Sequence, residues 1–422
     1  MARVVVVGGG FAGMSAAARL AKLRHEVTLL EAGDELGGRL RGHTIDGHTW
    51  QLSPDTVTLP GVLRDLFRKS GRPIERVLDL VQVGGRRHVF DDRTHLDLPL
   101  GNRGDQNEAV TEALGADTWS PWVDTLADPW DTLRRSVLER LLDRDDLDRS
   151  TRRALAARRP LTRVARKDLV DDRLRAIVLD DVRLDGHRPA GTPAFVAVQH
   201  YVERTFGRWR IDGGLPALAD GLVDRLQERT VDVRFGQRAH EIVVTAGRVS
   251  GVVTQAEEVD AEIVVWCAPT WPSPLPDPPG IPAIPARRTL LTLDETAREL
   301  PRDLLAHSDP PVRAWSDGSP QWSLAHHNAE DPLIALARVG VDIREHVLDR
   351  HDLSPSDLVR LGHWGWTWQG WTTLFDRPGV GADQRFGGTL FMAGAHAHPG
   401  GTIEEIGSAT AAIAEAIGAA PR

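Results

Sequence analysis

Three glycines near the start of the chain have the spacing of a phosphate-binding turn. Gly8, Gly10 and Gly13 form the pattern Gly-x-Gly-x-x-Gly directly after the apolar run 3–7. In such a turn the first glycine permits a tight bend, the second lets the backbone approach a pyrophosphate, and the third lets the next helix pack closely on the strand. The pyrophosphate then accepts hydrogen bonds from the free N–H groups at the positive end of that helix. The pattern therefore predicts a dinucleotide site.

An acidic residue follows at the position where such a site holds a ribose. Residues 26–30 are predicted to form a second strand, and Glu31 comes directly after them. This places it close to the roughly 20-residue spacing expected of the acid that accepts hydrogen bonds from ribose hydroxyls. The first helix is expected from about residue 11 to 23. The predicted dinucleotide contacts at this end of the chain are Gly8, Gly10, Phe11, Ala12, Gly13, Glu31 and Ala32.

A second glycine pair, followed by an arginine, distinguishes between dinucleotides. Gly37, Gly38 and Arg39 resemble the Gly-Gly-Arg signature of the flavoprotein superfamily that contains the amine oxidases, protoporphyrinogen oxidases and carotenoid desaturases. In that superfamily the glycines let a loop pass close to the cofactor, and the arginine directs its charged donors at the diphosphate. The resemblance implies FAD, held non-covalently, as the cofactor.

The C-terminal part of the chain resembles the terminal strand and turn of phytoene desaturases. Residues 388–401 contain a Gly-Ala step and a His-Pro-Gly loop, and a helix is expected from Thr402 to about Ile417. In this superfamily that helix directs its N–H groups at the pyrimidine edge of the flavin, which becomes negative on reduction. In relatives, a strand at the position of Ile242 holds the adenine through its backbone groups. The resemblance therefore adds Ile242, Gly394, Thr402, Ile403 and Ile406 to the flavin contacts.

A tryptophan-rich segment precedes the C-terminal flavin strand. Trp364, Trp366 and Trp368 alternate as they would on one face of a strand, and Trp371 follows. Tryptophan faces bind apolar groups or cations, so we expect substrate contacts from these four residues and from His398. The alternative is that the tryptophans fill the core of the substrate domain.

No residue is clearly identified as a catalytic base. Glu404 and Glu405 lie near the predicted flavin edge, where a partly buried carboxylate would have a raised pKa and could accept a proton. Capping of the helix N-terminus is the alternative role for them. His396 is a third candidate for catalysis. The single cysteine, Cys267, excludes an intrachain disulfide framework, and no metal site is expected.

Composition and charge fit a soluble enzyme. The chain has 422 residues, 41% of them hydrophobic, which is more than one core usually accommodates. Its net charge of −9, from 51 basic and 60 acidic residues, gives no indication of nucleic-acid binding. No apolar run has the length of a membrane span, so a cytoplasmic location is expected and membrane contact is not indicated. The oligomeric state is left open.

The remaining patterns place the site in an α/β fold with two domains. Alternating apolar and polar residues predict strands at 231–235, 240–244 and 248–253, and a further buried strand is expected at 262–269. Eight prolines between Pro269 and Pro285 mark a crossing between domains. Residues 76–204 are interpreted as a helical cap. We predict a Rossmann-type FAD-binding domain of residues 1–75, 206–270 and 384–422. A discontinuous α+β substrate or cap domain would comprise residues 76–205 and 271–383.

Together these features predict an FAD-dependent oxidoreductase nearest to the phytoene-desaturase-like proteins. It would desaturate or oxidise a small, largely apolar organic substrate by hydride transfer to flavin N5, with molecular oxygen or another electron acceptor reoxidising the flavin. One alternative is a flavin amine oxidase that produces an imine and hydrogen peroxide. Another is a non-enzymatic prenyl or lipid carrier of the same fold, related to Rab dissociation inhibitors. Residues 50–54 and Glu404 depart from the desaturase pattern.

Overall fold

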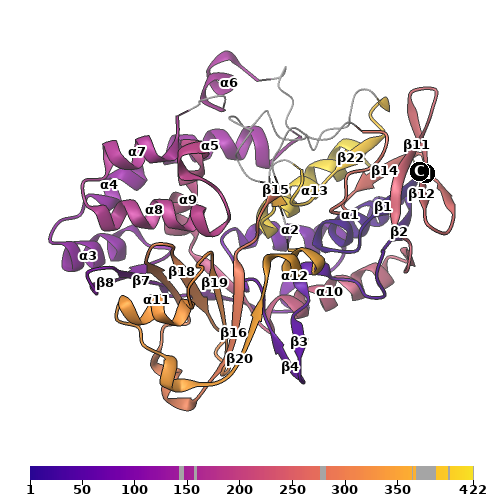
Figure 1. The fold of residues 1–422 in the computed structure, drawn as a ribbon. Helices are drawn as coiled ribbons and strands as arrows, with labels where there is room; N and C mark the ends of the chain where they lie inside the picture. The colour runs from indigo at the N-terminus through magenta and orange to yellow at the C-terminus, as the bar shows by residue number, and fades with distance from the viewer. Residues whose placement is uncertain are drawn as a thin grey trace.

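The computed structural model describes residues 1–141, 147–155, 159–275, 282–363, 365–366, 386–397 and 400–421. Two sheets of five and seven strands organise the chain, and helices cover both (Figure 1). The α-helices are α1 (Phe11–Lys22), α2 (Pro60–Ser70), α3 (Arg103–Leu114), α4 (Trp119–Asp124), α5 (Ala127–Leu133), α6 (Arg149–Leu155), α7 (Leu161–Asp168), α8 (Asp172–Leu184), α9 (Val198–Phe206), α10 (Gly214–Glu228), α11 (Pro332–Arg338), α12 (Pro355–Arg360) and α13 (Ile403–Ile417). None of these helices is long and apolar enough to cross a bilayer.

A five-stranded parallel sheet carries the glycine pattern. Its order is β10-β2-β1-β14-β22, so the first strand of the chain lies at the centre. Strands buried on both faces are expected to be continuous β-branched runs, and the four valines of β1 are all buried. The strands are β1 (Arg3–Val7), β2 (Glu26–Leu30), β10 (Asp232–Arg234), β14 (Ile263–Trp266) and β22 (Leu390–Met392).

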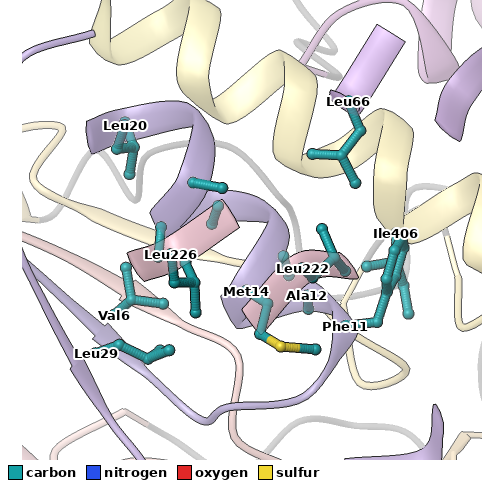
Figure 2. Packing of buried hydrophobic residues seen from close by; sticks show 14 of the residues in the cluster. Val6, Phe11, Ala12, Met14, Leu20, Leu29, Leu66, Leu222, Leu226 and Ile406 are labelled. Carbon is teal, nitrogen blue, oxygen red and sulfur yellow. The ribbon is translucent and has the colours of Figure 1, made fainter. Parts of the chain in front are cut away.

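Small residues in α1 let three other helices pack against it. The alanines of α1 are buried, and the helix contacts α2, α10 and α13. Figure 2 shows Phe11 and Ile406 side by side, with Met14 directed at the sheet near Val6 and Leu29. The expected helices from residue 11 and to Ile417 are confirmed. The N-terminal and C-terminal parts of the chain therefore share one core.

The second main sheet combines two distant segments of the chain. Its order is β20-β16-β19-β18-β17-β7-β8, and β7 joins β17 in parallel whereas the other pairs are antiparallel. Helices from α3 to α9 lie along the side of β7 and β8 (Figure 1). The strands are β7 (Gly85–Phe90), β8 (His95–Pro99), β16 (Arg287–Leu293), β17 (Asp303–His307), β18 (Val312–Trp315), β19 (Gln321–His326) and β20 (Val347–Leu353).

The prediction of a helical cap for residues 76–204 is wrong in its first part. Residues 80–83, 85–90 and 95–99 form strands. The reason is that apolar and polar residues alternate there, a pattern that favours a half-buried strand. Leu96 and Leu98 are buried, whereas His95 and Asp97 are exposed. Further along, α5 ends at Leu133 and a π-type turn covers residues 134–138.

Smaller sheets join these layers. The three-stranded sheets are β11-β12-β13 and β5-β9-β6, and the two-stranded sheets are β3-β4 and β15-β21. Their bounds are β3 (His43–Ile45), β4 (His48–Trp50), β5 (Thr56–Val57), β6 (Leu80–Val83), β9 (Arg208–Ile211), β11 (Ala239–Thr245), β12 (Arg248–Thr254), β13 (Glu258–Asp260), β15 (Pro282–Ala283) and β21 (Gly365–Trp366).

A cluster of charged side chains lies inside the helix-covered part of the second sheet. Asp303 accepts hydrogen bonds from three guanidinium groups, those of Arg86 at 3.3 Å, Arg208 at 2.8 Å and Arg313 at 3.0 Å. These bonds join β7, β9, β17 and β18. We call this group the Asp303 cluster; its members are Arg86, Asp181, Glu203, Arg208, Asp303 and Arg313.

Candidate functional site

Each of the three glycines of the first turn has a different structural setting. Gly8 has φ of +100°, a backbone conformation that favours glycine. A Cβ on Gly13 would lie 1.7 Å from the carbonyl oxygen of Gly8, so only glycine lets α1 start this close to β1. A Cβ on Gly10 would meet no protein atom within 4 Å. Among the described residues, nothing in the protein itself explains glycine at position 10, and the open space is where a ligand would approach.

The start of α1 faces this open space without a side-chain cap. Gly10 is the N-cap residue and has no side chain to cap the helix, and no described side chain accepts a hydrogen bond from the first turn. That turn contains no acidic residue either. Phe11 and Ala12 are buried beside it. Uncapped N–H groups at a helix start, with the positive end of the helix dipole, favour an anion such as a diphosphate.

Glu31 lies at the end of β2, against the same turn. Its carboxylate accepts hydrogen bonds from the N–H of Gly9 at 2.6 Å and of Gly33 at 2.7 Å. These two bonds fix the orientation of the carboxylate beside the glycine turn. A carboxylate has about four acceptor sites, so it can still accept hydrogen bonds from a ribose. The ribose contact, and that of exposed Ala32, stay predictions.

The second glycine pair lies directly on the first turn. The N–H of Gly37 donates to the carbonyl oxygen of Gly9 at 2.9 Å. Gly38, with φ of +51°, approaches so closely that a Cβ would lie 3.3 Å from the Cα of Gly10. The loop therefore passes close to the first turn, and its passage close to the cofactor stays a prediction. Arg39 follows directly on this loop and is exposed.

The guanidinium of Arg39 has no ion-pair partner among the described residues. Its side chain forms no hydrogen bond or ion pair with any described residue and is accessible to solvent. The pKa of Arg39 is nevertheless lowered by burial, and the charge of Asp185 opposes this shift. The exposed and unpaired guanidinium of Arg39 is thus open to a ligand. It has the donors that bind a diphosphate.

The start of α13 is fixed by a capping box. The Thr402 side chain accepts a hydrogen bond from the N–H of Glu405 at 3.2 Å, and the Glu405 carboxylate accepts one from the N–H of Thr402 at 3.0 Å. The Glu404 carboxylate accepts hydrogen bonds from both the N–H and the hydroxyl of Thr58. Both carboxylates are therefore engaged in holding α13, and a catalytic role for either stays a prediction.

The starts of α13 and α1 converge. Ile406 packs beside Phe11, with Ile403 partly buried against the same core (Figure 2). A Cβ on Gly407 would lie 3.8 Å from the Phe11 ring. Two helix N-termini from opposite ends of the sequence thus lie near each other, and Thr402 caps the second. This is the arrangement that the resemblance predicts for a flavin extending from α1 to α13.

His396 is buried beside the end of β22. Burial lowers its pKa to about 4, so the ring is neutral near pH 7. It stands edge-on to Trp271, with ring centroids 6.4 Å apart. Gly394 has φ of +130°, and a Cβ there would lie 3.1 Å from the His396 ring. On β11, the N–H of Ile242 donates to the carbonyl oxygen of Ser273 at 2.8 Å. The flavin roles of these residues stay predictions.

The predicted substrate residues are largely outside the described part of the chain. Trp364, Trp368, Trp371 and His398 are not among the described residues. Trp366 belongs to β21, whose backbone pairs with β15, and its side chain is not described. A substrate role for all five stays a prediction.

Sequence reasoning missed three residues that the fold brings near Arg39. We call Arg39, Asp185, Arg288 and His363 the Arg39 cluster, because the charge of Arg39 acts on the pKa of each of the other three. They come from the end of α8, from β16 and from the segment after α12. No local pattern could identify them, since single arginines and aspartates are abundant throughout this chain.

A family comparison agrees with this geometry. Residues 11–294 match the model of the flavin containing amine oxidoreductases. The chain belongs to that family. The predicted class, a flavoprotein oxidoreductase of the amine oxidase and phytoene desaturase superfamily, is therefore confirmed at the level of the family.

Individual relatives include carotenoid enzymes. The chain is 31% identical over 277 residues to a zeta-carotene-forming phytoene desaturase of Myxococcus xanthus, covering 63% of this chain and 53% of the relative. It is 26% identical over 284 residues to a 4,4'-diapolycopene oxygenase of Methylomonas, covering 62% and 55%. The matched region thus spans about half the length of these curated relatives.

Solved structures share the fold. Wild-type putrescine oxidase bound to putrescine aligns with 99% of this chain and 98% of its own, with a TM-score of 0.62 and 14% identity. At this identity the likeness concerns the fold alone. It confirms the predicted mixed α/β architecture.

Proposed function

We propose that this chain is an FAD-dependent oxidoreductase that accepts a hydride at flavin N5 from a small, largely apolar organic molecule. The observation that carries the proposal is the open space above Gly10, where a Cβ would meet no protein atom. Around that space lie the uncapped start of α1 and the unpaired Arg39. The carotenoid desaturases and oxygenases among the relatives support oxidation of an apolar substrate.

The residues present fit FAD. The N–H groups at the start of α1 and the guanidinium of Arg39 would hold the diphosphate, and Glu31 would hold the ribose. The N–H groups at the start of α13 would stabilise negative charge at the pyrimidine edge of the ring. When bound, FAD supplies a two-electron acceptor for a hydride. The protein's own contribution is to orient the substrate C–H bond and to exclude water.

We also propose that the two main sheets mark two domains. Residues 1–75, 206–270 and 384–422 would form the FAD-binding domain, because the strands of the five-stranded sheet come from these segments. Residues 76–205 and 271–383 would form the substrate or cap domain around the seven-stranded sheet. The substrate would then bind between the flavin and this second sheet.

Anaerobic reduction of the purified holoprotein tests the reaction. Loss of the flavin absorbance on mixing with a polyene or another apolar alkene precursor is expected, while simple amines leave the spectrum unchanged. Bleaching by amines with peroxide release in air would identify an amine oxidase instead. A protein that folds, binds no flavin and retains lipid would contradict the proposal and support the carrier alternative.

A further inference from the structure

Arg288 is a second arginine without an acidic partner near the proposed cofactor site. It lies at the start of β16, where its Nε donates to the carbonyl oxygen of Leu52 at 2.9 Å and its Nη1 to that of Ala286 at 2.7 Å. Its guanidinium lies over the Trp315 ring, 5.4 Å from the centroid. No described carboxylate forms an ion pair with it. These contacts fix the orientation of the group and leave the two N–H bonds of Nη2 available.

Three contacts show how the segments that carry Arg288, Asp185 and Arg39 pack. Leu52 belongs to the loop between β4 and β5, so its bond to Arg288 joins this loop to β16 of the second sheet. At the end of α8, the carbonyl oxygen of Leu184 contacts His327 Nε2 at 3.2 Å, which places Asp185 near the start of β16. After α12, a Cβ on Gly362 would lie 3.9 Å from Cγ of Arg39. The four residues of the Arg39 cluster therefore come from the loop after β2, the end of α8, strand β16 and the segment after α12.

The charges of the Arg39 cluster do not balance. Arg39 and Arg288 are both cations, whereas Asp185 is the one described carboxylate that acts on the pKa of each. Burial and Arg39 lower the pKa of Arg288 to about 10, so it remains protonated near pH 7. The nearby Arg313 is paired with Asp303. His363 is neutral, because burial and then Arg39 and Arg288 lower its pKa well below the usual range, and its buried Nδ1 has no partner among the described residues.

We propose that Arg288 binds a carboxylate group of the substrate. The inference rests on the proposed function, because FAD would neutralise Arg39 and leave Arg288 as the cation facing the substrate. A guanidinium preorganised by carbonyl groups and an aromatic face is suited to a carboxylate, which it binds through charge-assisted hydrogen bonds. The substrate class is therefore an apolar molecule that ends in a carboxylate, such as a medium-chain or long-chain acid. A simple hydrocarbon would offer no acceptor to the N–H groups of Arg288 Nη2.

Binding of octanoate tests this assignment. Calorimetric titration of the holoprotein with octanoate, octanamide and octylamine compares an acid, a neutral amide and an amine of one chain length. Saturable binding of octanoate alone is expected, and Arg288→Met should weaken it by about tenfold or more, because charge-assisted hydrogen bonds are lost. The matched control is Arg287→Met, since Arg287 is the exposed neighbour on β16 and should leave the affinity unchanged. Arg288→Lys should restore part of the affinity.

Asp185 provides a second measurement that a purely structural role of Arg288 would not change. Asp185 is exposed, yet desolvation by the protein around it and the charge of Asp181 raise its pKa to about 6, against the opposing charges of Arg313, Arg288 and Arg39. Ionised Asp185 competes with a bound carboxylate for the arginines, so octanoate should bind more tightly as the pH falls from about 7.5 to about 5.5. Octanoate itself stays mostly ionised over this range. Asp185→Asn should abolish this pH dependence.

The outcomes separate this inference from the proposed function. Equal octanoate affinity of wild type and Arg288→Met, tighter binding of octylamine, or absence of saturable octanoate binding would overturn the carboxylate assignment. The flavin spectrum of the same preparation is recorded first. If it showed no flavin, the proposed function would fail, while calorimetry would still measure carboxylate binding at Arg288.

Discussion

Asp303→Asn is expected to lower the free energy of unfolding by about 3–5 kcal/mol, the range found when one partner of a buried ion pair is removed. The carboxylate accepts from Arg86, Arg208 and Arg313, of which Arg86 is only 4% exposed. An amide of the same shape removes the charge and leaves these guanidinium groups facing one another. Urea denaturation followed by tryptophan fluorescence measures the change.

The matched control is an aspartate–arginine pair at the surface. Asp342→Asn breaks the ion pair with Arg344, in which both side chains are about half exposed, and should change the unfolding free energy by about 1 kcal/mol or less. Equal stabilities of the two variants would show that the Asp303 cluster does not hold the second sheet together.

Acid should act on the Asp303 cluster in the same direction. Burial by itself raises the pKa of Asp303, but Arg313, Arg86 and Arg208 together hold it well below the usual range. The folded-state pKa of Asp303 is therefore lower than its unfolded-state pKa of about 4. Such a carboxyl group contributes its full stabilisation above about pH 4, and this contribution is lost as the pH falls below that value. Wild type should therefore lose more stability than Asp303→Asn below about pH 4.

Gly13→Ala is expected to disrupt the first turn and, with it, flavin binding. The new Cβ would lie 1.7 Å from the carbonyl oxygen of Gly8, and both atoms belong to backbone at the junction of β1 and α1. Relieving the contact requires α1 to move away from the sheet, at a cost of about 1–3 kcal/mol or more. Both the melting temperature and the flavin content of the purified protein should fall.

Gly61→Ala is the control for this variant. Gly61 lies in α2, where a Cβ would meet no atom within 4 Å. Alanine is favoured over glycine in a helix by up to about 1 kcal/mol, so this variant should be as stable as wild type or slightly more stable. Its flavin content should be unchanged. A Gly13→Ala protein that behaved like Gly61→Ala would contradict the close contact.

Much of the cofactor end of the fold could be predicted from the sequence, because its signals are local. The glycine turn, the valine strand before it and the cap at Thr402 each depend on residues within a few positions. The strands of residues 85–99 were missed, although Leu96 and Leu98 alternate with polar residues, because arginines and aspartates dominate that segment. Their partner in the sheet, β17, lies more than 200 residues further along the chain.

The Arg39 cluster could not be predicted either, because its residues are far apart in the sequence. Asp185, Arg288 and His363 are separated by long stretches of sequence, and only the pairing of distant strands and helices brings them together. Their chemistry depends on the protein around them, since the same arginine on an exposed strand would be an ordinary surface charge. The role that the sequence suggested for Glu405, by contrast, was ambiguous between catalysis and capping, and the structure shows the cap.

The most direct test of the FAD site is a titration of Gly10→Ala apoprotein with FAD. Gly10 has φ of −75°, which alanine adopts without strain, and its Cβ would meet no protein atom within 4 Å. The variant should therefore unfold at the wild-type urea concentration. If the diphosphate occupies the space above Gly10, FAD affinity should fall by about tenfold or more, because the methyl group blocks close approach of the backbone. Wild-type affinity for FAD in Gly10→Ala would contradict this placement of the cofactor.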